Sequence, residues 1–341
     1  MNGSRAHPPS RDATGRVAVH AAARPRWRTW AVRGLTLVFF AAVAALLAHQ
    51  ARTIEWDTVG ATLRGYRPGT LALAALFVGL SYLAYAGYEL LAKRYSGHAV
   101  RDRLVARIGA ISYCFNLNLG AWLGGIGFRY RLYSQLGVGP ATTARVYLSV
   151  LKTNWSGYLL VAAVAFGAYG LDLPPQWQLS DRGLRGIGAL LGVAAVVYLL
   201  ACAKATRRSW SVRGHEFELP DGRQAVLQMA LGAANWMLMG AVVYTLLPHV
   251  DQAPRYGTVL ATLLLASIAG VATHIPAGLG VLEALFLALL GHRVPHAQLL
   301  GALLAYRAMY FIGPLIVAGL SYAALESAIR AGRIGKRSAA G

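Results

Sequence analysis

The stretch HIPAGLGVLEALFLALL at residues 274–290 decides the fold of this chain. It places a proline, two glycines, a histidine and a glutamate in a segment that is otherwise apolar enough to lie in a bilayer. A helix broken at this depth exposes backbone groups that lipid cannot satisfy, so the break must be buried in protein or line a wet cavity. A glutamate there is costly and points to function. The stretch predicts a polytopic membrane protein with a polar site inside the membrane.

The composition agrees with a membrane protein. Hydrophobic residues make up 56% of the chain and charged residues only 13%, whereas about 25% of a soluble domain is charged. The basic residues that give the net charge of +20 lie in short segments between apolar runs. This distribution is typical of orientation signals in a membrane protein rather than of nucleic-acid binding. Anionic lipid headgroups are the partners expected for these basic segments. Cys114 and Cys202 lie in separate apolar segments and are interpreted as core residues.

The apolar runs predict an all-α fold, because about 20 apolar residues cross a bilayer as a helix. Residues 1–33 are predicted to be a disordered basic tail, 34–325 the transmembrane domain and 326–341 a second short basic tail. Two stretches, 106–128 and 258–291, are interrupted by polar residues and glycines. Six full spans are predicted at 32–49, 70–91, 145–170, 184–203, 225–247 and 297–325.

The distribution of Lys and Arg predicts the orientation of these spans. With the N-terminus in the cytoplasm, the inner segments hold 24 Lys and Arg residues and the outer loops hold 7. Both termini are then cytoplasmic, and each interrupted stretch must begin and end on one side. Each is therefore interpreted as a broken re-entrant hairpin, although two short spans would also fit 258–291. Hairpins that enter from opposite faces suggest the inverted-repeat architecture of transporters.

Glu283 and Arg307 are the two charges expected to pair inside the membrane. Glu283 follows the break at Pro276, Gly278 and Gly280, and Arg307 lies on the next span, after a short outer turn. Segments joined by a short loop are normally neighbours. The pair would either shape a headgroup or ion site or lock two helices together, and the residues leave both interpretations open.

Three other polar positions carry competing interpretations. Lys152, with Asn154 nearby, would hold a phosphate or carboxylate, or would extend its amine to the cytoplasmic interface. Glu89 stands four residues before Lys93 and is interpreted as an interfacial ion pair within one helix. His274 would couple proton movement, or would stay neutral and satisfy backbone freed at the break.

Two further patterns bear on packing and on metals. The spacings Gly120–Gly124 and Gly188–Gly192 favour close helix packing rather than chemistry. Two histidines flank a proline at 292–296, but no third ligand is evident, so no metal site is predicted.

Three motifs together resemble a known family. SYCFNLNLGAWLGGIGFRYR at 112–131 is similar to its first hairpin, HIPAGLGVLEALFLALL to its Pro-x-Gly-x-Gly-x-x-Glu signature, and AYRAMYFIGP to its third signature. The family is the transmembrane region of lysylphosphatidylglycerol synthase, the flippase part of the multiple peptide resistance factor, and the chain also resembles its stand-alone YbhN-like inner-membrane subgroup. The matching residues are Asn116, Gly124, Gly125 and Arg129 in the first motif, Pro276, Gly278, Gly280 and Glu283 in the second, and Arg307, Tyr310 and Pro314 in the third.

The resemblance implies a phospholipid translocase of the bacterial inner membrane. No segment fits the aminoacyl-transferase domain of the related synthases, so neither enzyme activity nor a cofactor is expected. A membrane-embedded enzyme or accessory subunit acting on a lipid-linked substrate stays the alternative, and a lipid-binding structural protein a third. A homodimer or a lipid-modifying enzyme is a possible partner. The residues expected to bind substrate are Glu283, Arg307, Arg129, Lys152, Asn116, Asn154 and His274.

Overall fold

The computed structural model describes residues 56–334 with gaps, together with four isolated residues before them. The chain divides into two compact units, 1–46 and 47–341, and the account below concerns the second. The predicted first span and N-terminal tail lie largely or wholly outside the described residues. The gaps are 170, 172, 174–179, 206–208, 213–214, 249–252, 274 and 276–277, and the isolated residues are 38, 41, 45 and 52.

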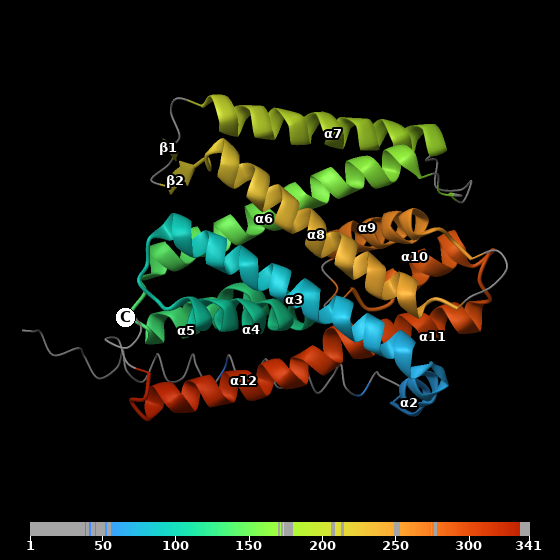
Figure 1. The fold of residues 1–341 in the computed structure, drawn as a ribbon, viewed down its shortest axis with the longest axis horizontal. Helices are drawn as coiled ribbons and strands as arrows, with labels where there is room; N and C mark the ends of the chain where they lie inside the picture. Colours follow the sequence, from blue (N-terminus) through green and yellow to red (C-terminus); the bar gives the residue numbers. More distant parts are fainter. Residues whose placement is uncertain are drawn as a thin grey trace, which may run out of the picture. The chain divides into compact units, whose positions relative to one another are not determined.

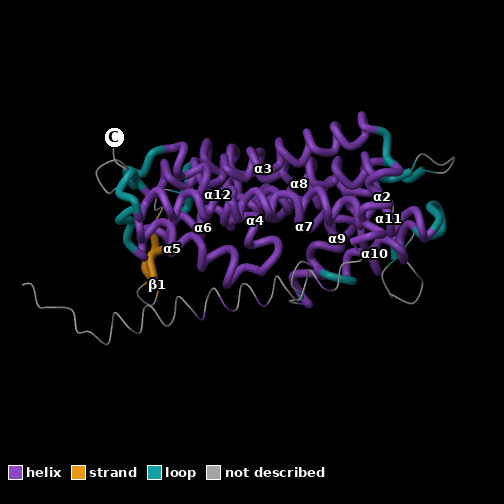
Figure 2. Tube along the Cα trace, turned by 90° about the horizontal axis from the view of Figure 1, so that it is seen from below, coloured by secondary structure: helices purple, strands orange, loops and turns teal. Residues whose placement is uncertain are grey.

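Helices make up almost all of the described chain (Figures 1 and 2). The predicted all-α architecture is confirmed except for one antiparallel ribbon in the loop before α8, where β1 (Ser209–Val212) pairs with β2 (His215–Glu218). The α-helices are α2 (Trp56–Gly65), α3 (Pro68–Ser96), α4 (Asp102–Gly120), α5 (Phe128–Gln135), α6 (Pro140–Ala168), α7 (Asp181–Lys204), α8 (Gly222–Leu246), α9 (Tyr256–Thr273), α10 (Val281–Leu290), α11 (His296–Arg307) and α12 (Gly313–Arg330), and the π-helical segments are η1 (Ala121–Gly127) and η4 (Ala308–Ile312).

Five stretches of helix within the described residues are long and apolar enough to cross a membrane. Four of them, α3, α7, α8 and the continuous α11–η4–α12, cover predicted spans. The fifth is α9, the first arm of the predicted second hairpin. The predicted span 145–170 is a single helix, α6, but it is not among the five because Lys152, Asn154 and Ser156 lower its hydropathy.

Glycines set a close helix contact of the bundle, where α6 and α8 cross (Figure 1). A Cβ added to Gly157 would lie 2.1 Å from the backbone carbon of Gly232. Small residues at such a crossing let two backbones touch, as is common in membrane bundles. The predicted close packing at Gly188 is also confirmed, since its Cβ would lie 2.8 Å from the backbone nitrogen of Gly167 on α6.

We expect Gly232→Ala to destabilise the protein by about 1–3 kcal/mol, the usual cost of overpacking. The new Cβ would lie 2.2 Å from the carbonyl oxygen of Thr153, so the two helices must separate. Thermal unfolding in detergent measures the effect. Gly186→Ala on α7 is the control, because nothing lies within 4 Å of its added Cβ. Equal melting temperatures for the two variants would contradict the crossing.

Candidate functional site

The second hairpin is a helix that stops and turns back. α9 ends at Thr273, α10 begins at Val281 and packs against α9. Gly278 and Gly280 have φ of 57° and 80°, a conformation that favours glycine. The fold-back predicted for 258–291 is confirmed. The ten residues of α10 are too few to cross a bilayer, which supports the re-entrant interpretation over two short spans. His274 and Pro276 lie outside the described residues.

The predicted pairing of Glu283 with Arg307 is confirmed. The Arg307 guanidinium donates from Nε to one carboxylate oxygen at 2.5 Å and from Nη2 to the other at 3.0 Å. Arg307 also donates to the carbonyl of Gly278 at 3.1 Å, and the Gly280 N–H donates to Glu283 at 2.9 Å. The Glu283 side chain is 19% exposed and that of Arg307 9%. Arg307 thus ties α11 to the break itself and to the first turn of α10.

Pro314 explains how the segment after Arg307 makes contacts with other helices. Proline has no N–H to donate, so the carbonyl four residues earlier, that of Tyr310, loses its usual helical partner. Tyr82 on α3 donates its hydroxyl to that carbonyl at 3.1 Å. Asn118 of α4 donates to the neighbouring carbonyl of Phe311 at 3.5 Å. The η4 segment is therefore fastened to both α3 and α4.

The first hairpin is built from α4, η1 and α5. Gly120 ends α4 with φ of 78°, and the chain turns back on itself. A Cβ on Gly124 would lie 2.0 Å from the carbonyl oxygen of Phe115, and one on Gly125 would lie 2.6 Å from the side-chain oxygen of Asn116. The chain folds back over 106–128 as predicted, and these two glycines lie where the arms approach most closely. The π-helical return arm was not predicted.

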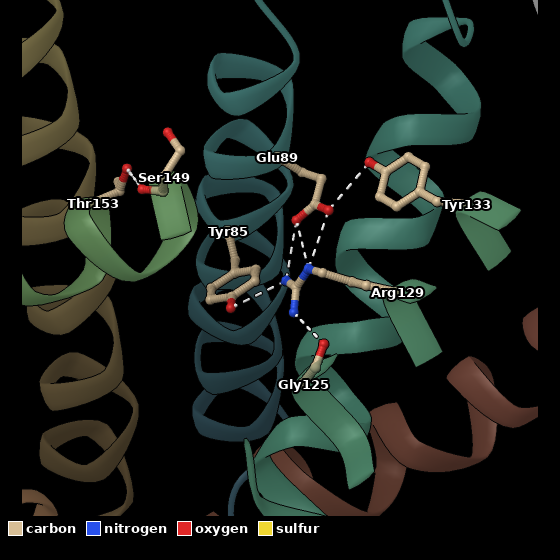
Figure 3. A network of polar contacts seen from close by, with 7 residues as sticks. All are labelled: Tyr85, Glu89, Gly125, Arg129, Tyr133, Ser149 and Thr153. Carbon is tan, nitrogen blue, oxygen red and sulfur yellow. Dashed lines mark hydrogen bonds and ion pairs between the residues drawn. The ribbon is translucent and has the colours of Figure 1, made fainter. Parts of the chain in front are cut away.

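A fully buried ion pair holds this hairpin to α3 (Figure 3). Arg129 donates to the Glu89 carboxylate at 3.0–3.2 Å, and neither side chain is exposed. Arg129 also donates to the carbonyl of Gly125 at 2.7 Å and to the Tyr85 hydroxyl at 3.4 Å. Tyr133 donates its hydroxyl to Glu89 at 3.2 Å. These contacts satisfy both charges without any ligand.

This pair corrects two expectations from the sequence. Arg129 was expected to recruit headgroups, but its guanidinium is buried and is engaged by protein groups, so it does not face lipid. Glu89 was expected to pair with Lys93 along α3, whereas Lys93 donates to Asp102 at 2.6 Å. Residues four apart share a helix face, but Glu89 is fully buried where the first hairpin supplies Arg129. Lys93, in the last turn of α3, reaches Asp102 at the start of α4.

The two hairpins are fastened in the same way. In each, an arginine donates hydrogen bonds from two of its nitrogens to one carboxylate. It donates a further hydrogen bond to a glycine carbonyl of the hairpin. The roles are exchanged: the first hairpin supplies the arginine, and the second supplies the glutamate. Such a bidentate arginine fixes geometry better than a lysine would.

A buried cluster of hydroxyls lies between the two pairs. Tyr310, three residues after Arg307, shares hydrogen bonds with Ser81 at 2.6 Å and with Tyr113 at 2.8 Å. Tyr113 stacks on Tyr85, the partner of Arg129, with ring centroids 3.7 Å apart. Packed contacts therefore join one ion pair to the other. The sequence analysis did not predict this cluster, although the spacing of Tyr82, Tyr85 and Tyr88 was a visible signal.

The chain is similar in sequence to one protein family and to two known proteins. Residues 32–318 match the family described as the lysylphosphatidylglycerol synthase TM region. The chain belongs to this family. It is 44% identical over 306 residues to "Inner membrane protein YbhN" of Escherichia coli K12, covering 89% of this chain and 94% of that protein. It is 31% identical over 279 residues to "Uncharacterized protein slr0712" of Synechocystis, covering 80% and 84%.

Two other residues predicted to bind substrate lie in the packing of α3, α6 and α8. Lys152 is partly buried, and its amine lies 5.2 Å from the ring centre of Tyr95 at the end of α3. The backbone carbonyl of Asn154 accepts a hydrogen bond from the Trp236 indole on α8 at 3.2 Å. Whether either residue binds substrate stays a prediction.

His98, in the loop that follows α3, makes stability depend on pH. Burial, and then the Lys93 charge, lower the pKa of this histidine below its usual 6.5. Between the two pKa values the unfolded chain binds more protons, so stability rises with pH. We expect melting temperature to fall as the pH is lowered from about 7 to about 5, and the slope to be smaller in His98→Asn. Equal slopes would contradict the assignment.

Proposed function

We propose that this protein moves phospholipids between the leaflets of the membrane, by a path along the second hairpin. The observation that supports it is the Glu283–Arg307 pair at a broken helix, with Glu283 still 19% exposed. A polar break inside an apolar bundle must be buried in protein or line a wet cavity, and a charged residue at such a break points to a functional site. Membership of a lipid-synthase membrane family supports the same conclusion.

The mechanism follows from the groups at the break. A headgroup that leaves water needs hydrogen bonds and charge, whereas its acyl chains can stay in lipid. The first turn of α10 and the Arg307 guanidinium supply positive potential for a phosphate. Lys152, Asn116, Asn154 and His274 are proposed to assist, and Arg129 is proposed to position the first hairpin rather than to touch lipid.

The proposed location is the inner membrane, with both termini in the cytoplasm. The name of the Escherichia coli relative supports the membrane, and the excess of Lys and Arg in the inner segments supports the orientation. The family match covers the membrane region of the synthase, so aminoacylation is not proposed.

The test is exchange of fluorescent phosphatidylglycerol between leaflets of phosphatidylcholine liposomes that hold the purified protein. We expect rapid exchange with the unaltered protein and a loss on the order of tenfold with Glu283→Gln, which corresponds to about 1.4 kcal/mol in barrier height. Arg64→Gln, on the exposed surface of α2, is the control and should exchange normally. No exchange by the unaltered protein, with or without a proton gradient, would overturn the proposal and favour a membrane-embedded enzyme or its subunit.

A further inference from the structure

An apolar groove runs between α6, α7 and α8, away from both hairpins. It consists of two adjoining hollows of about 550 and 490 Å³ that share Leu199. α7, which forms its outer wall, lies at the edge of the bundle (Figure 1). The larger hollow is lined mainly by Leu160, Ala163, Gly167, Gly188, Gly192 and Met229.

Small residues make this groove possible. Gly188 lies against the backbone of Gly167, so that α6 and α7 touch there. Gly192, one turn further along α7, has only the Cβ of Ala163 near its own added Cβ, at 3.6 Å. The absence of side chains at 167 and 192 leaves a channel where larger residues would have filled it.

Each end of the groove carries an arginine. Arg185 in the first turn of α7 lines one hollow, and Arg223 in the first turn of α8 lines the other. The 24 residues of α7 span about 36 Å at 1.5 Å per residue, close to the thickness of the hydrocarbon core. The groove therefore extends along much of the hydrocarbon core and carries a cation at each end.

The two ends differ in the charge they can offer. Arg185 pairs with Asp181 at 3.1 Å. Arg223 is exposed and follows Gly222, whose added Cβ would lie 3.2 Å from Ala203, the residue before Lys204. Arg223 and Lys204 thus each come directly after a residue that makes this contact between α7 and α8. The nearby Asp221 carboxylate caps α8 by accepting from the Gln224 N–H at 2.7 Å.

We infer that this groove binds one acyl chain of an anionic phospholipid, whose phosphate lies on Arg223. An apolar channel that ends at an exposed cation matches a molecule with an anionic head and an apolar tail. The site does not depend on the proposed translocation, because a lipid held here could serve transport or only support α7. None of the residues that line it belongs to either hairpin.

The test uses photolabelling with phosphatidylglycerol that carries a diazirine on its acyl chain, present as a minor component of phosphatidylcholine liposomes. Crosslinked peptides are located by mass spectrometry. We expect label on Leu199 and Met229, and a severalfold loss in Gly192→Leu, which fills the groove. Gly186→Leu is the matched control: it adds the same bulk to α7 at a position that has open space and does not line the groove.

A second pair of variants tests the headgroup. Arg223→Gln should remove the preference for labelled phosphatidylglycerol over the phosphatidylcholine analogue, whereas Arg103→Gln, an exposed arginine at the start of α4, should keep it. Label that is equal in Gly192→Leu and Gly186→Leu would overturn the proposal. A crosslink between cysteines placed at position 199 of two chains, in place of lipid label, would show that a second copy occupies the groove. If the unaltered protein is labelled as expected but exchanges no lipid between leaflets, the proposed function is refuted and the proposal for the groove stands.

Discussion

Arg129→Ala is expected to lower the free energy of unfolding by about 3–5 kcal/mol, because it leaves the Glu89 carboxylate buried and unpaired. The pair has no exposed surface, so water cannot replace the lost guanidinium. The same change removes the hydrogen bond from Arg129 to the carbonyl of Gly125, one turn earlier in the return arm of the first hairpin. Thermal or denaturant unfolding of the purified protein in detergent measures the loss.

Matched variants separate the loss of stability caused by the missing charge partner from the loss caused by the missing side-chain volume. Removing both charges with Glu89→Gln and Arg129→Met should recover much of the stability, since an apolar replacement of a buried pair is often nearly neutral. Arg129→Lys should fall between, because an ammonium cannot make the bidentate contact. Arg185→Ala, which breaks an exposed pair, should cost less than about 1 kcal/mol. A double variant no more stable than Arg129→Ala would show that the charge pair is not the source of the effect.

The sequence predicts well those features that depend on residues close together in the chain. Pro276, Gly278 and Gly280 interrupt an apolar run, and a break in such a run has few solutions in lipid. The Glu283–Arg307 pair follows because a short turn joins their helices. The fold-back at 106–128 follows from charge counts on either side, which forbid a single crossing.

The features that the sequence did not reveal depend on contacts between distant segments. Glu89 and Arg129 are 40 residues apart, and a local partner, Lys93, offered a plausible pairing that the structure contradicts. The contact of Tyr310 with Ser81 and Tyr113 joins three helices. Single-sequence reasoning ranks partners by spacing, whereas burial selects the partner that the packing brings near.

Arg307→Ala is expected to reduce lipid exchange at least tenfold, which corresponds to about 1.4 kcal/mol or more in barrier height. Arg307 is the group that holds Glu283 and the Gly278 carbonyl at once, so its loss frees both the break and the first turn of α10. It also removes the cation proposed to meet the phosphate. The measurement is exchange of fluorescent phosphatidylglycerol between leaflets, at equal protein content per liposome.

A structural lock and a lipid site predict different behaviour of Arg307→Lys and of the reversed pair, Glu283→Arg with Arg307→Glu. If the pair only locks helices, the reversed pair should restore both melting temperature and exchange. If Arg307 meets the headgroup, the reversed pair should recover stability but not exchange, because its cation then lies on α10 rather than on α11. Arg307→Lys keeps the cation on α11 but loses the bidentate hydrogen bonding to Glu283. We expect it to retain more exchange than Arg307→Ala, and equal exchange by the two would remove Arg307 from the proposed path.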